Sequence, residues 1–315
     1  SMFVIAIVTS IYIFFGGYVS TAINSLIQGI IMLVGVVFMV LRVVSVSGGM
    51  SAALDTLASI PTAAGSGALA QPFGPNPLDL LVIVLMTSIG TFGLPQMISK
   101  YKGIRDRKAV RLGTLMSTVF ALIIGGGAYL IGGLSRVVNE RLALAFNSGN
   151  LDEVMPVIFE TILSPVLLAV LVVLMLSASM STLAGVVLVS APTFTRSILK
   201  KDSIGLMRIM SIVFVFASYL IAVTPSAIVT LMAFSWGAVS GSFIGPYIWG
   251  LYSKKITRAG AAAGMLGGLG TVVIGAVISL LNNPATATSW APRLAVMAMA
   301  VSLIATPLVS RLTVN

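Results

Sequence analysis

Small and hydroxyl-bearing residues gather in one part of a long apolar segment, residues 157–190. Ala178, Ser181, Thr182 and Gly185 stand at positions i, i+3, i+4 and i+7, so on a helix they share one face. Hydroxyl and backbone carbonyl oxygens suit a hard monovalent cation such as sodium. Small residues also let a neighbouring helix approach closely, so the pattern by itself leaves both sodium binding and helix packing open.

A second candidate is the stretch from Gly90 to Gln96, which reads Gly-Thr-Phe-Gly-Leu-Pro-Gln, inside the apolar segment 78–98. Two glycines and a proline so close together should weaken or break a helix. Backbone groups freed inside a membrane are tolerated only beside protein or a cavity, and transporters place substrate at such discontinuous helices. A solute site is therefore one interpretation of this stretch, and a kink that serves packing is the other.

A third pattern is a glycine repeat in the segment 227–252. Gly237, Gly241 and Gly245 recur at four-residue spacing, and Pro246 follows directly. Small residues at this spacing predict a close helix contact or a hinge. The next apolar segment, 259–281, is also rich in glycine, and we interpret it in the same way.

The elements that must position these residues are membrane helices. Hydrophobic residues make up 58% of the 315-residue chain and charged residues only 8%, whereas soluble domains carry about 25% charged residues. Lipid must therefore be the solvent of this chain. The chain has no cysteine and no histidine, which removes thiolate metal sites and the commonest general base. We expect no catalytic residue, no organic cofactor and no enzymatic activity.

Nine segments qualify as membrane spans, because a bilayer core needs about 20 apolar residues per helix. The first segment is short and starts at the first residue, so we interpret it as a helix shortened by truncation. The candidate spans are residues 2–15, 20–44, 78–98, 110–134, 157–190, 207–224, 227–252, 259–281 and 293–310.

The basic residues predict the orientation of these spans. If the N-terminus lies outside, only Arg42, Arg136, Arg141 and Arg293 of the 18 basic residues are external. Basic loops remain in the cytoplasm, so the net charge of +10 is explained without a nucleic-acid partner. We expect a multi-pass protein integral to the cell (plasma) membrane, with its basic loops cytoplasmic and membrane lipid around it. Binding of lipid headgroups is the alternative role for the basic clusters.

The acidic residues argue against proton coupling. All eight of them fall in loops or near the ends of the spans. Proton relays in membranes normally use a carboxylate or a histidine inside the membrane. A chain without buried charges must hold an ion through hydroxyl and carbonyl oxygens, which again favours sodium.

At these residues the chain resembles a known family, the sodium:solute symporters. Residues 12–17 (Tyr-Ile-Phe-Phe-Gly-Gly) and 24–29 (Asn-Ser-Leu-Ile-Gln-Gly) are similar to the family's Tyr-Thr-x-x-Gly-Gly and Asp-x-x-Gln-Gly signature. Residues 93–96 (Gly-Leu-Pro-Gln) and 108–113 (Lys-Ala-Val-Arg-Leu-Gly) resemble its Pro-His and Ala-x-x-x-Gly stretch, and residues 180–183 (Met-Ser-Thr-Leu) resemble its sodium-site helix. These motifs occur in the right order over nearly the whole chain.

The resemblance implies an all-α, polytopic transmembrane bundle with the LeuT-type inverted-repeat core, forming a single transmembrane domain over residues 1–315. Residues 1–44 would be a remnant of the first repeat (core helices 4 and 5), and residues 78–252 would be the second repeat (core helices 6–10). Residues 253–315 would form two additional C-terminal helices. The first three core helices would be missing, so we expect this polypeptide by itself to be an inactive fragment.

The resemblance also implies a sodium site. Sodium, the coupling ion, would be bound by the carbonyl of Ala178 and by the side chains of Ser181 and Thr182. In this family an aspartate usually stands three residues before the signature glutamine, where this chain has Ser25. That aspartate is thought to help sodium pass inward, so the serine leaves the choice of ion and the strength of coupling open.

The family's solute-contacting residues correspond to Ser88, Thr91 and Phe92. The predicted function is sodium-coupled secondary active uptake of a small organic solute by alternating access, with the identity of the solute left open. The alternative is a symporter-like transmembrane sensor module of a larger signalling protein. A cavity left by the missing helices should be flanked by the spans 78–98 and 157–190. Because unpaired carbonyls cost several kcal/mol each in lipid, we expect the isolated chain to be unstable, or its helices to collapse together or pair with another chain. A homodimer that buries this face is one such arrangement.

Overall fold

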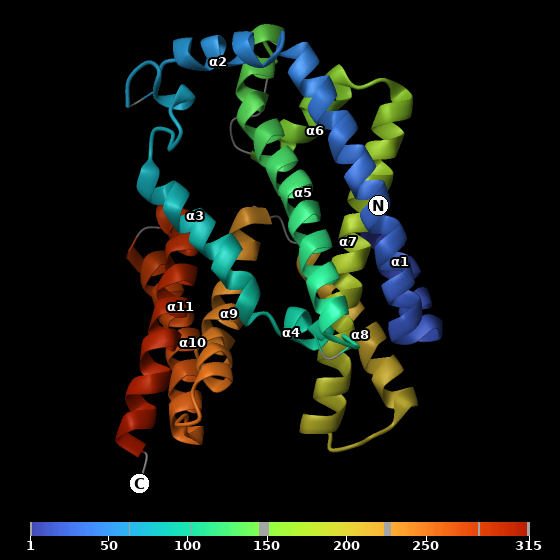
Figure 1. Cartoon of the computed structure of the whole chain (residues 1–315), viewed down its shortest axis with the longest axis vertical. Coiled ribbons are helices and arrows are strands. Elements are labelled where there is room, and N and C mark those ends of the chain that lie inside the picture. Colours follow the sequence, from blue (N-terminus) through green and yellow to red (C-terminus); the bar gives the residue numbers. More distant parts are fainter. Residues whose placement is uncertain are drawn as a thin grey trace. The chain divides into compact units, whose positions relative to one another are not determined.

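The structure is a computed structural model that describes residues 2–62, 64–101, 103–144, 151–223, 228–282 and 284–313. Every regular element within these ranges is a helix (Figure 1). The chain divides into two compact units. The first unit contains residues 1–71 and 104–225, and the second contains residues 72–103 and 226–315.

Among the described residues, the first unit contains four long helices, α1, α5, α7 and α8, and several short ones. Its elements are α1 (Met2–Val46), α2 (Met50–Ser59), η1 (Ala68–Ala70), α5 (Arg107–Leu142), η3 (Leu151–Glu153), α6 (Val154–Ile162), α7 (Pro165–Thr193), the π-helical turn η4 (Phe194–Ile198) and α8 (Ile204–Ala222).

The second unit consists of an interrupted helix and three long helices. Its elements are α3 (Pro77–Ile89), η2 (Gly90–Gly93), α4 (Pro95–Tyr101), α9 (Ile228–Tyr252), α10 (Arg258–Asn282) and α11 (Pro284–Thr313).

Most of the predicted spans correspond to helices. Among the described residues, seven helices are long and apolar enough to cross a membrane, and two shorter apolar helices, Phe3–Phe15 and Pro77–Gly93, correspond to the first and third predicted spans. The prediction of a polytopic all-α membrane protein is therefore confirmed. The short helices α2 and η1 were not predicted, because they lie in a connection without a long apolar run.

The predicted single span 157–190 was wrong at its start. The structure divides this segment into α6 and α7, which meet at Leu163 and Ser164 in extended backbone conformations. Pro165 explains the division, because proline lacks a backbone N–H and disfavours the helical conformation of the residue before it. The continuous hydrophobicity of the segment concealed this break.

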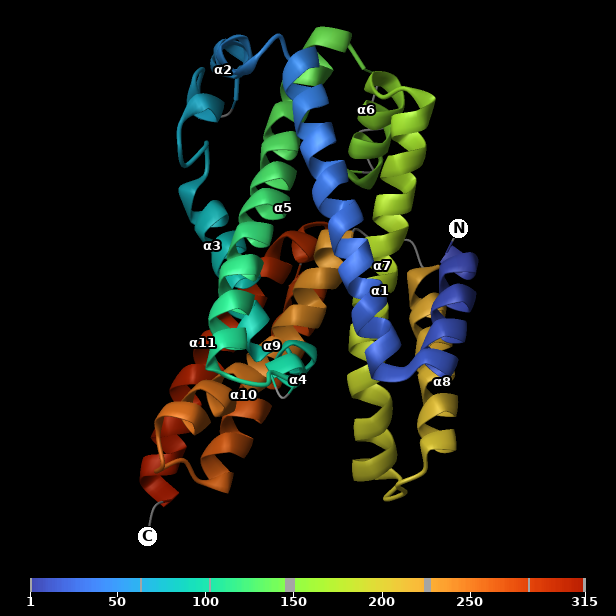
Figure 2. The same cartoon turned by 45° about the vertical axis from the view of Figure 1, so that its right-hand side comes forward.

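The boundary between the first two predicted spans also differs from the prediction. A loop was expected at residues 16–19, but the structure has helical backbone throughout α1, and no proline at these positions removes a backbone donor. Figure 2 shows the dark-blue first part of α1 beside α8 and its lighter-blue remainder beside α5 and α7. Ile13 accordingly packs with Val215 of α8, whereas Val36 lies against Gly127 of α5.

Helices α9, α10 and α11 pack very closely, as the glycine repeat predicted. A Cβ atom on Gly245 would collide with the backbone carbonyl of Ser302 in α11, and one on Gly268 of α10 would collide with the carbonyl oxygen of Gly241 in α9. Only glycine allows these backbones to approach so closely. The indole Nε1 of Trp249 in α9 also donates a hydrogen bond to the carbonyl of Leu303, at 2.8 Å.

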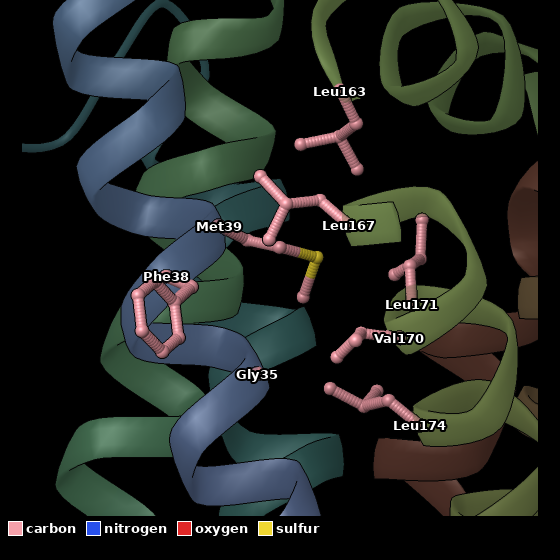
Figure 3. A pocket seen from close by; sticks show the side chains of 8 residues that line it. All are labelled: Gly35, Phe38, Met39, Leu163, Leu167, Val170, Leu171 and Leu174. Atoms are coloured by element: carbon pink, nitrogen blue, oxygen red, sulfur yellow. The ribbon is translucent and has the colours of Figure 1, made fainter. Parts of the chain in front are cut away.

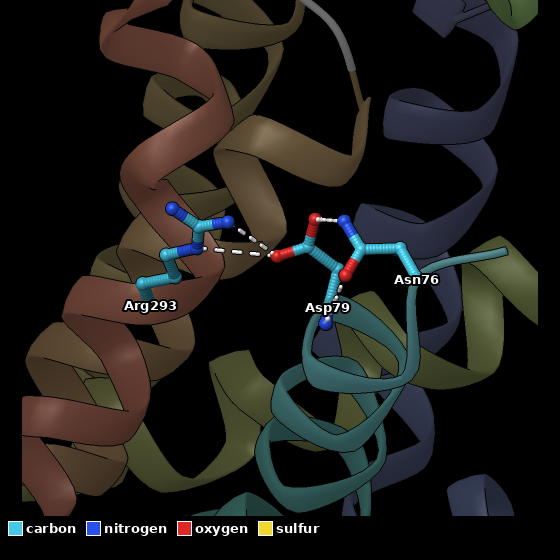
Figure 4. A network of polar contacts seen from close by, with 3 residues as sticks. All are labelled: Asn76, Asp79 and Arg293. Atoms are coloured by element: carbon cyan, nitrogen blue, oxygen red, sulfur yellow. Dashed lines mark hydrogen bonds and ion pairs between the residues drawn. The ribbon is translucent and has the colours of Figure 1, made fainter. Parts of the chain in front are cut away.

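An ion pair connects the start of α3 to α11 (Figure 4). Asn76 caps α3 by accepting a bond from the Asp79 amide, and its side-chain amide donates to the Asp79 carboxylate at 2.5 Å. Arg293 donates to the same carboxylate through Nη2 at 2.6 Å and through Nε at 3.2 Å. The Arg293 guanidinium also lies 5.0 Å from the ring centre of Trp290. These contacts fix the first half of the interrupted helix against α11.

Candidate ion and solute sites

The three predicted sodium ligands lie together on α7. Thr182 Oγ1 donates a hydrogen bond to the Ala178 carbonyl at 3.0 Å, so two of the predicted oxygens are direct neighbours. Ser181 lies on the same helical face, where its hydroxyl donates to Ser25 Oγ of α1 at 3.2 Å. Ala178 and Ser181 are half-buried and Thr182 is exposed. Such oxygens are the ligands that hard cations prefer.

The partner of Ser181 was not predicted. Ser25 was noted only because it replaces the family's aspartate, and 156 residues separate it from Ser181. The hydrogen bond shows that this position of α1 lies directly beside the hydroxyl face of α7. A substitution at residue 25 therefore acts at the predicted sodium site itself.

Gln28 is a second residue of α1 to which the sequence assigned no role beyond the signature. It follows Ser25 by one helical turn and is 5% exposed. Its Oε1 has no hydrogen-bond partner among the described residues. Buried amide oxygens normally accept a bond, so the Gln28 oxygen is available for a donor or a cation. Its burial and its unpartnered oxygen are the signal, and the sequence does not contain them.

Farther along the same two helices the interface becomes apolar. Figure 3 shows a small pocket between α1 and α7, lined by Gly35, Phe38, Met39, Leu163, Leu167, Val170, Leu171 and Leu174. Its volume is about 10 Å³, which is no more than one water molecule requires, and all of the side chains that line it are apolar. The pocket is too small and too apolar to hold a solute. We therefore interpret it as a packing gap between the two helices.

The predicted break in the third span is present. Helix α3 ends at Ile89, a 3₁₀ turn covers Gly90–Gly93, and α4 begins at Pro95. Leu94 between them is extended, with φ −81° and ψ 118°. Pro95 accounts for this conformation, because the residue before a proline is driven from helical to extended backbone.

Two glycines seat this break on neighbouring helices. A Cβ on Gly93 would collide with the hydroxyl of Ser240 in α9 and lie 2.7 Å from the Ser240 carbonyl oxygen. One turn earlier, a Cβ on Gly90 would lie 2.9 Å from Met299 and 3.5 Å from the ring of Trp236. The glycines therefore form the face of the break that packs against α9 and α11.

The predicted solute-contacting residues are less buried than these two glycines. Ser88 is exposed and Thr91 is half-buried, while Phe92 is 56% exposed. Thr91 Oγ1 donates a hydrogen bond to the carbonyl of Ser88 at 2.9 Å, so these two residues are direct neighbours. All three remain accessible after the break has packed against its own unit.

The two sets of site residues belong to different units. The predicted sodium ligands lie in the first unit and the predicted solute-contacting residues in the second. The structure brings together the members of each set, and the expected cavity between the two sets stays a prediction.

The chain is similar in sequence to known sodium symporters. The model of the sodium:solute symporter family matches residues 1–268. The chain is 25% identical over 289 residues to the sodium/pantothenate symporter of Haemophilus influenzae, covering 87% of this chain and 57% of that protein. It is 27% identical over 298 residues to the Escherichia coli sodium/pantothenate symporter, covering 89% and 58%. It is 26% identical over 292 residues to a Staphylococcus aureus sodium/proline symporter, covering 87% and 54%.

A solved structure shares the fold. A Na⁺-coupled sialic acid symporter in a substrate-bound, outward-open state superposes with a TM-score of 0.70 at 16% sequence identity. The match covers 100% of this chain and 66% of that one. The chain spans only about half the length of the curated relatives that it matches.

Proposed function

The chain belongs to the sodium:solute symporter family, and we propose that it forms part of a transporter that couples Na⁺ entry to the uptake of a small organic solute by alternating access. The relatives named above are symporters for pantothenate and proline, which supports an organic solute of similar size. Members of this family are transporters and not enzymes. We call a transporter of the relatives' full length that contains this chain the parent transporter.

The observation that carries the proposal is the oxygen-rich face of α7. The Ala178 carbonyl, the Ser181 hydroxyl and the Thr182 hydroxyl lie on one face of the helix and are tied to each other or to Ser25. We assign these three residues to Na⁺ binding. A hydroxyl that donates to a carbonyl keeps lone pairs on its oxygen, so Thr182 can make this hydrogen bond and still ligate a cation.

The break between α3 and α4 is the proposed border of the solute site. Ser88, Thr91 and Phe92 are accessible there, while Gly90 and Gly93 anchor the break to its own unit. Transporters place their solutes at discontinuous helices, because the interrupted backbone leaves polar groups available at membrane depth. This arrangement supports a solute with both polar and apolar parts, since a hydroxyl and an aromatic ring are offered together.

The proposed location is the cell membrane, with the basic loops on the cytoplasmic side. The connection from α4 to α5 and the connection from α7 to α8, counted together with the adjoining helix ends, carry ten of the 18 arginines and lysines. Basic loops remain on the cytoplasmic side during insertion. Arg42, Arg141 and Arg293 would then lie at the external ends of α1, α5 and α11.

The test is uptake by the purified parent transporter in liposomes. Labelled pantothenate, proline and sialic acid would be offered in turn, with an inward Na⁺ gradient, an inward proton gradient or no gradient. We expect saturable uptake of one of these or of a related solute, driven by the Na⁺ gradient alone. Equal uptake with a proton gradient, or uptake that ignores Na⁺, would contradict the proposal.

A further inference from the structure

Helix α9 contains a proline that interrupts its own hydrogen bonding. Pro246 lies inside the helix and has no backbone N–H. The carbonyl of Ser242, four residues earlier, therefore loses the donor that an α-helix would normally provide. Ser242 is buried, so this carbonyl needs a donor from elsewhere in the protein.

Ser302 of α11 supplies that donor. Its hydroxyl donates to the Ser242 carbonyl at 3.3 Å and accepts a hydrogen bond from the Gly245 amide at 3.2 Å. Ser302 is 0% exposed, so water does not compete for these groups. A serine hydroxyl has one proton to donate and lone pairs to accept, and both functions are used here across the helix interface.

The hydrogen-bond partner of the Ser302 hydroxyl differs in kind from those of the neighbouring hydroxyl residues on α11. Thr306 donates to the Ser302 carbonyl and Ser310 donates to the Thr306 carbonyl, each at 2.7 Å and each one turn back along the same helix. This is the common choice for such residues in a helix. Ser302 instead reaches α9, which the absence of a side chain on Gly245 makes possible.

The part of α9 that Ser302 stabilises is next to the residues of α9 on which the break between α3 and α4 packs. Ser240, which packs on Gly93, precedes Ser242 by two residues, and Trp236, which packs on Gly90, lies one turn before Ser240. If the α9 backbone loosened at Pro246, the surface beneath these glycines would move. Thr91 and Phe92 lie in the same short turn as both glycines.

We infer that Ser302 is a positioning residue for the solute site. Its hydroxyl supplies the hydrogen bond that the Ser242 carbonyl of α9 lacks because of Pro246. Helix α9 in turn holds the break that contains Thr91 and Phe92 in place. The inference rests on the proposed function for its consequence in transport, whereas the backbone contact itself does not. Ser302 touches no solute, and its effect passes through Ser242, Gly245 and the seat of the break.

The variant Ser302→Ala tests this inference in the parent transporter. We expect the solute concentration for half-maximal uptake to rise about threefold to tenfold, because a buried carbonyl loses its donor, with a smaller change in the half-saturating Na⁺ concentration. Ser310→Ala is the matched control. Ser310 is also buried on α11 and accepts a bond from the Thr257 amide at 3.2 Å, but it does not contact α9 at Pro246.

Rescue by Pro246→Ala separates this role from general loss of packing. Alanine restores an N–H that can pair with the Ser242 carbonyl, so Ser302→Ala should have little effect in the Pro246→Ala background. Amide hydrogen exchange provides a readout that does not need transport. Exchange in the segment 240–249 should accelerate in Ser302→Ala, remain normal in Ser310→Ala and return towards normal in the double variant.

Faster exchange, a raised half-saturating solute concentration and rescue by Pro246→Ala together support the inference. Faster exchange with unchanged solute dependence, or an effect that Pro246→Ala does not rescue, overturns it. If Ser302→Ala does not fold, the inference requires the double variant with Pro246→Ala to fold, because its α9 no longer needs the Ser302 hydroxyl. A double variant that also fails to fold would overturn the inference. If the parent transporter takes up no solute with Na⁺, the proposed function fails, and the exchange data alone still judge the contact at Pro246.

Discussion

The hydroxyl of Ser181 donates a hydrogen bond to the hydroxyl of Ser25 at 3.2 Å and so joins α7 to α1 inside the first unit. Ser25 occupies the position where the family signature has an aspartate, and Ser181 is a proposed Na⁺ ligand. The contact therefore places the departure from the signature directly beside the proposed ion site. We therefore expect the strength of ion binding to depend on the residue at position 25 of α1.

Ser25→Asp is expected to strengthen Na⁺ binding by the parent transporter. A carboxylate beside Ser181 adds a negative charge close to the proposed cation, and opposite charges at this range attract each other. The half-saturating Na⁺ concentration for uptake should fall severalfold, while solute dependence at saturating Na⁺ should change little. A half-saturating Na⁺ concentration that stays the same or rises would argue against an ion site beside residue 25.

Removing the hydroxyls of α7 should have the opposite effect. Thr182→Ala and Ser181→Ala each delete a proposed oxygen ligand, so each should raise the Na⁺ concentration needed for half-maximal uptake by about threefold to tenfold. Ser179→Ala is the control, because Ser179 is exposed on the same helix and its hydroxyl donates to the Met175 carbonyl of its own helix, at 2.9 Å. Unchanged Na⁺ dependence in both ligand variants would sink the assignment.

A bulky side chain at Thr91 should obstruct the solute. Thr91→Trp would fill the accessible side of the break and remove the hydrogen bond to the Ser88 carbonyl. The apparent affinity for solute should fall about tenfold or more, because the new side chain occupies space that the solute needs. Uptake kinetics would be compared with those of Leu266→Trp, which places tryptophan at a position of α10 that is 70% exposed. If Thr91→Trp alters only the amount of protein expressed, the stretch is a packing kink.

Gly93→Ala should destabilise the protein. The added methyl group would collide with the Ser240 hydroxyl and lie 2.7 Å from the Ser240 carbonyl oxygen, and backbone cannot move aside as a flexible side chain can. Overpacking of this kind costs about 1–3 kcal/mol, so the melting temperature in detergent should fall. Gly113→Ala in α5 is the matched control, because a methyl group there meets nothing within 4 Å. Equal melting temperatures for the two variants would show that the break does not rest tightly on α9.

Several features of the fold follow from short stretches of sequence. The break at Gly90–Pro95 was predictable, because glycine and proline act on the backbone of their own segment. Pro165 carried the same kind of information about the division between α6 and α7, but the apolar run around it concealed the break. The common face of Ala178, Ser181 and Thr182 was also predictable, since helical periodicity alone places residues one turn apart on one side.

The contacts that give those features a role depend on residues far apart in the chain. Ser25 and Ser181 are 156 residues apart, and Ser302 lies 60 residues beyond the carbonyl that it satisfies. Nothing in the local pattern of α11 distinguishes Ser302 from Thr306 or Ser310, which bond within their own helix. The burial of the Gln28 oxygen likewise could not be predicted from the sequence, because it depends on the helices that pack around α1.

Hydrophobicity, helical periodicity and proline chemistry act within a few residues, so they were enough to predict an all-helical membrane protein with an interrupted helix and a hydroxyl-bearing helix. The pairing of hydroxyls with carbonyls, and the close approach of one helix backbone to a glycine of another, depend instead on how the helices pack together. In lipid the backbone N–H and C=O groups must find their partners inside the protein. Those partners are chosen by the packing of whole helices, so they become visible only when the helices are assembled.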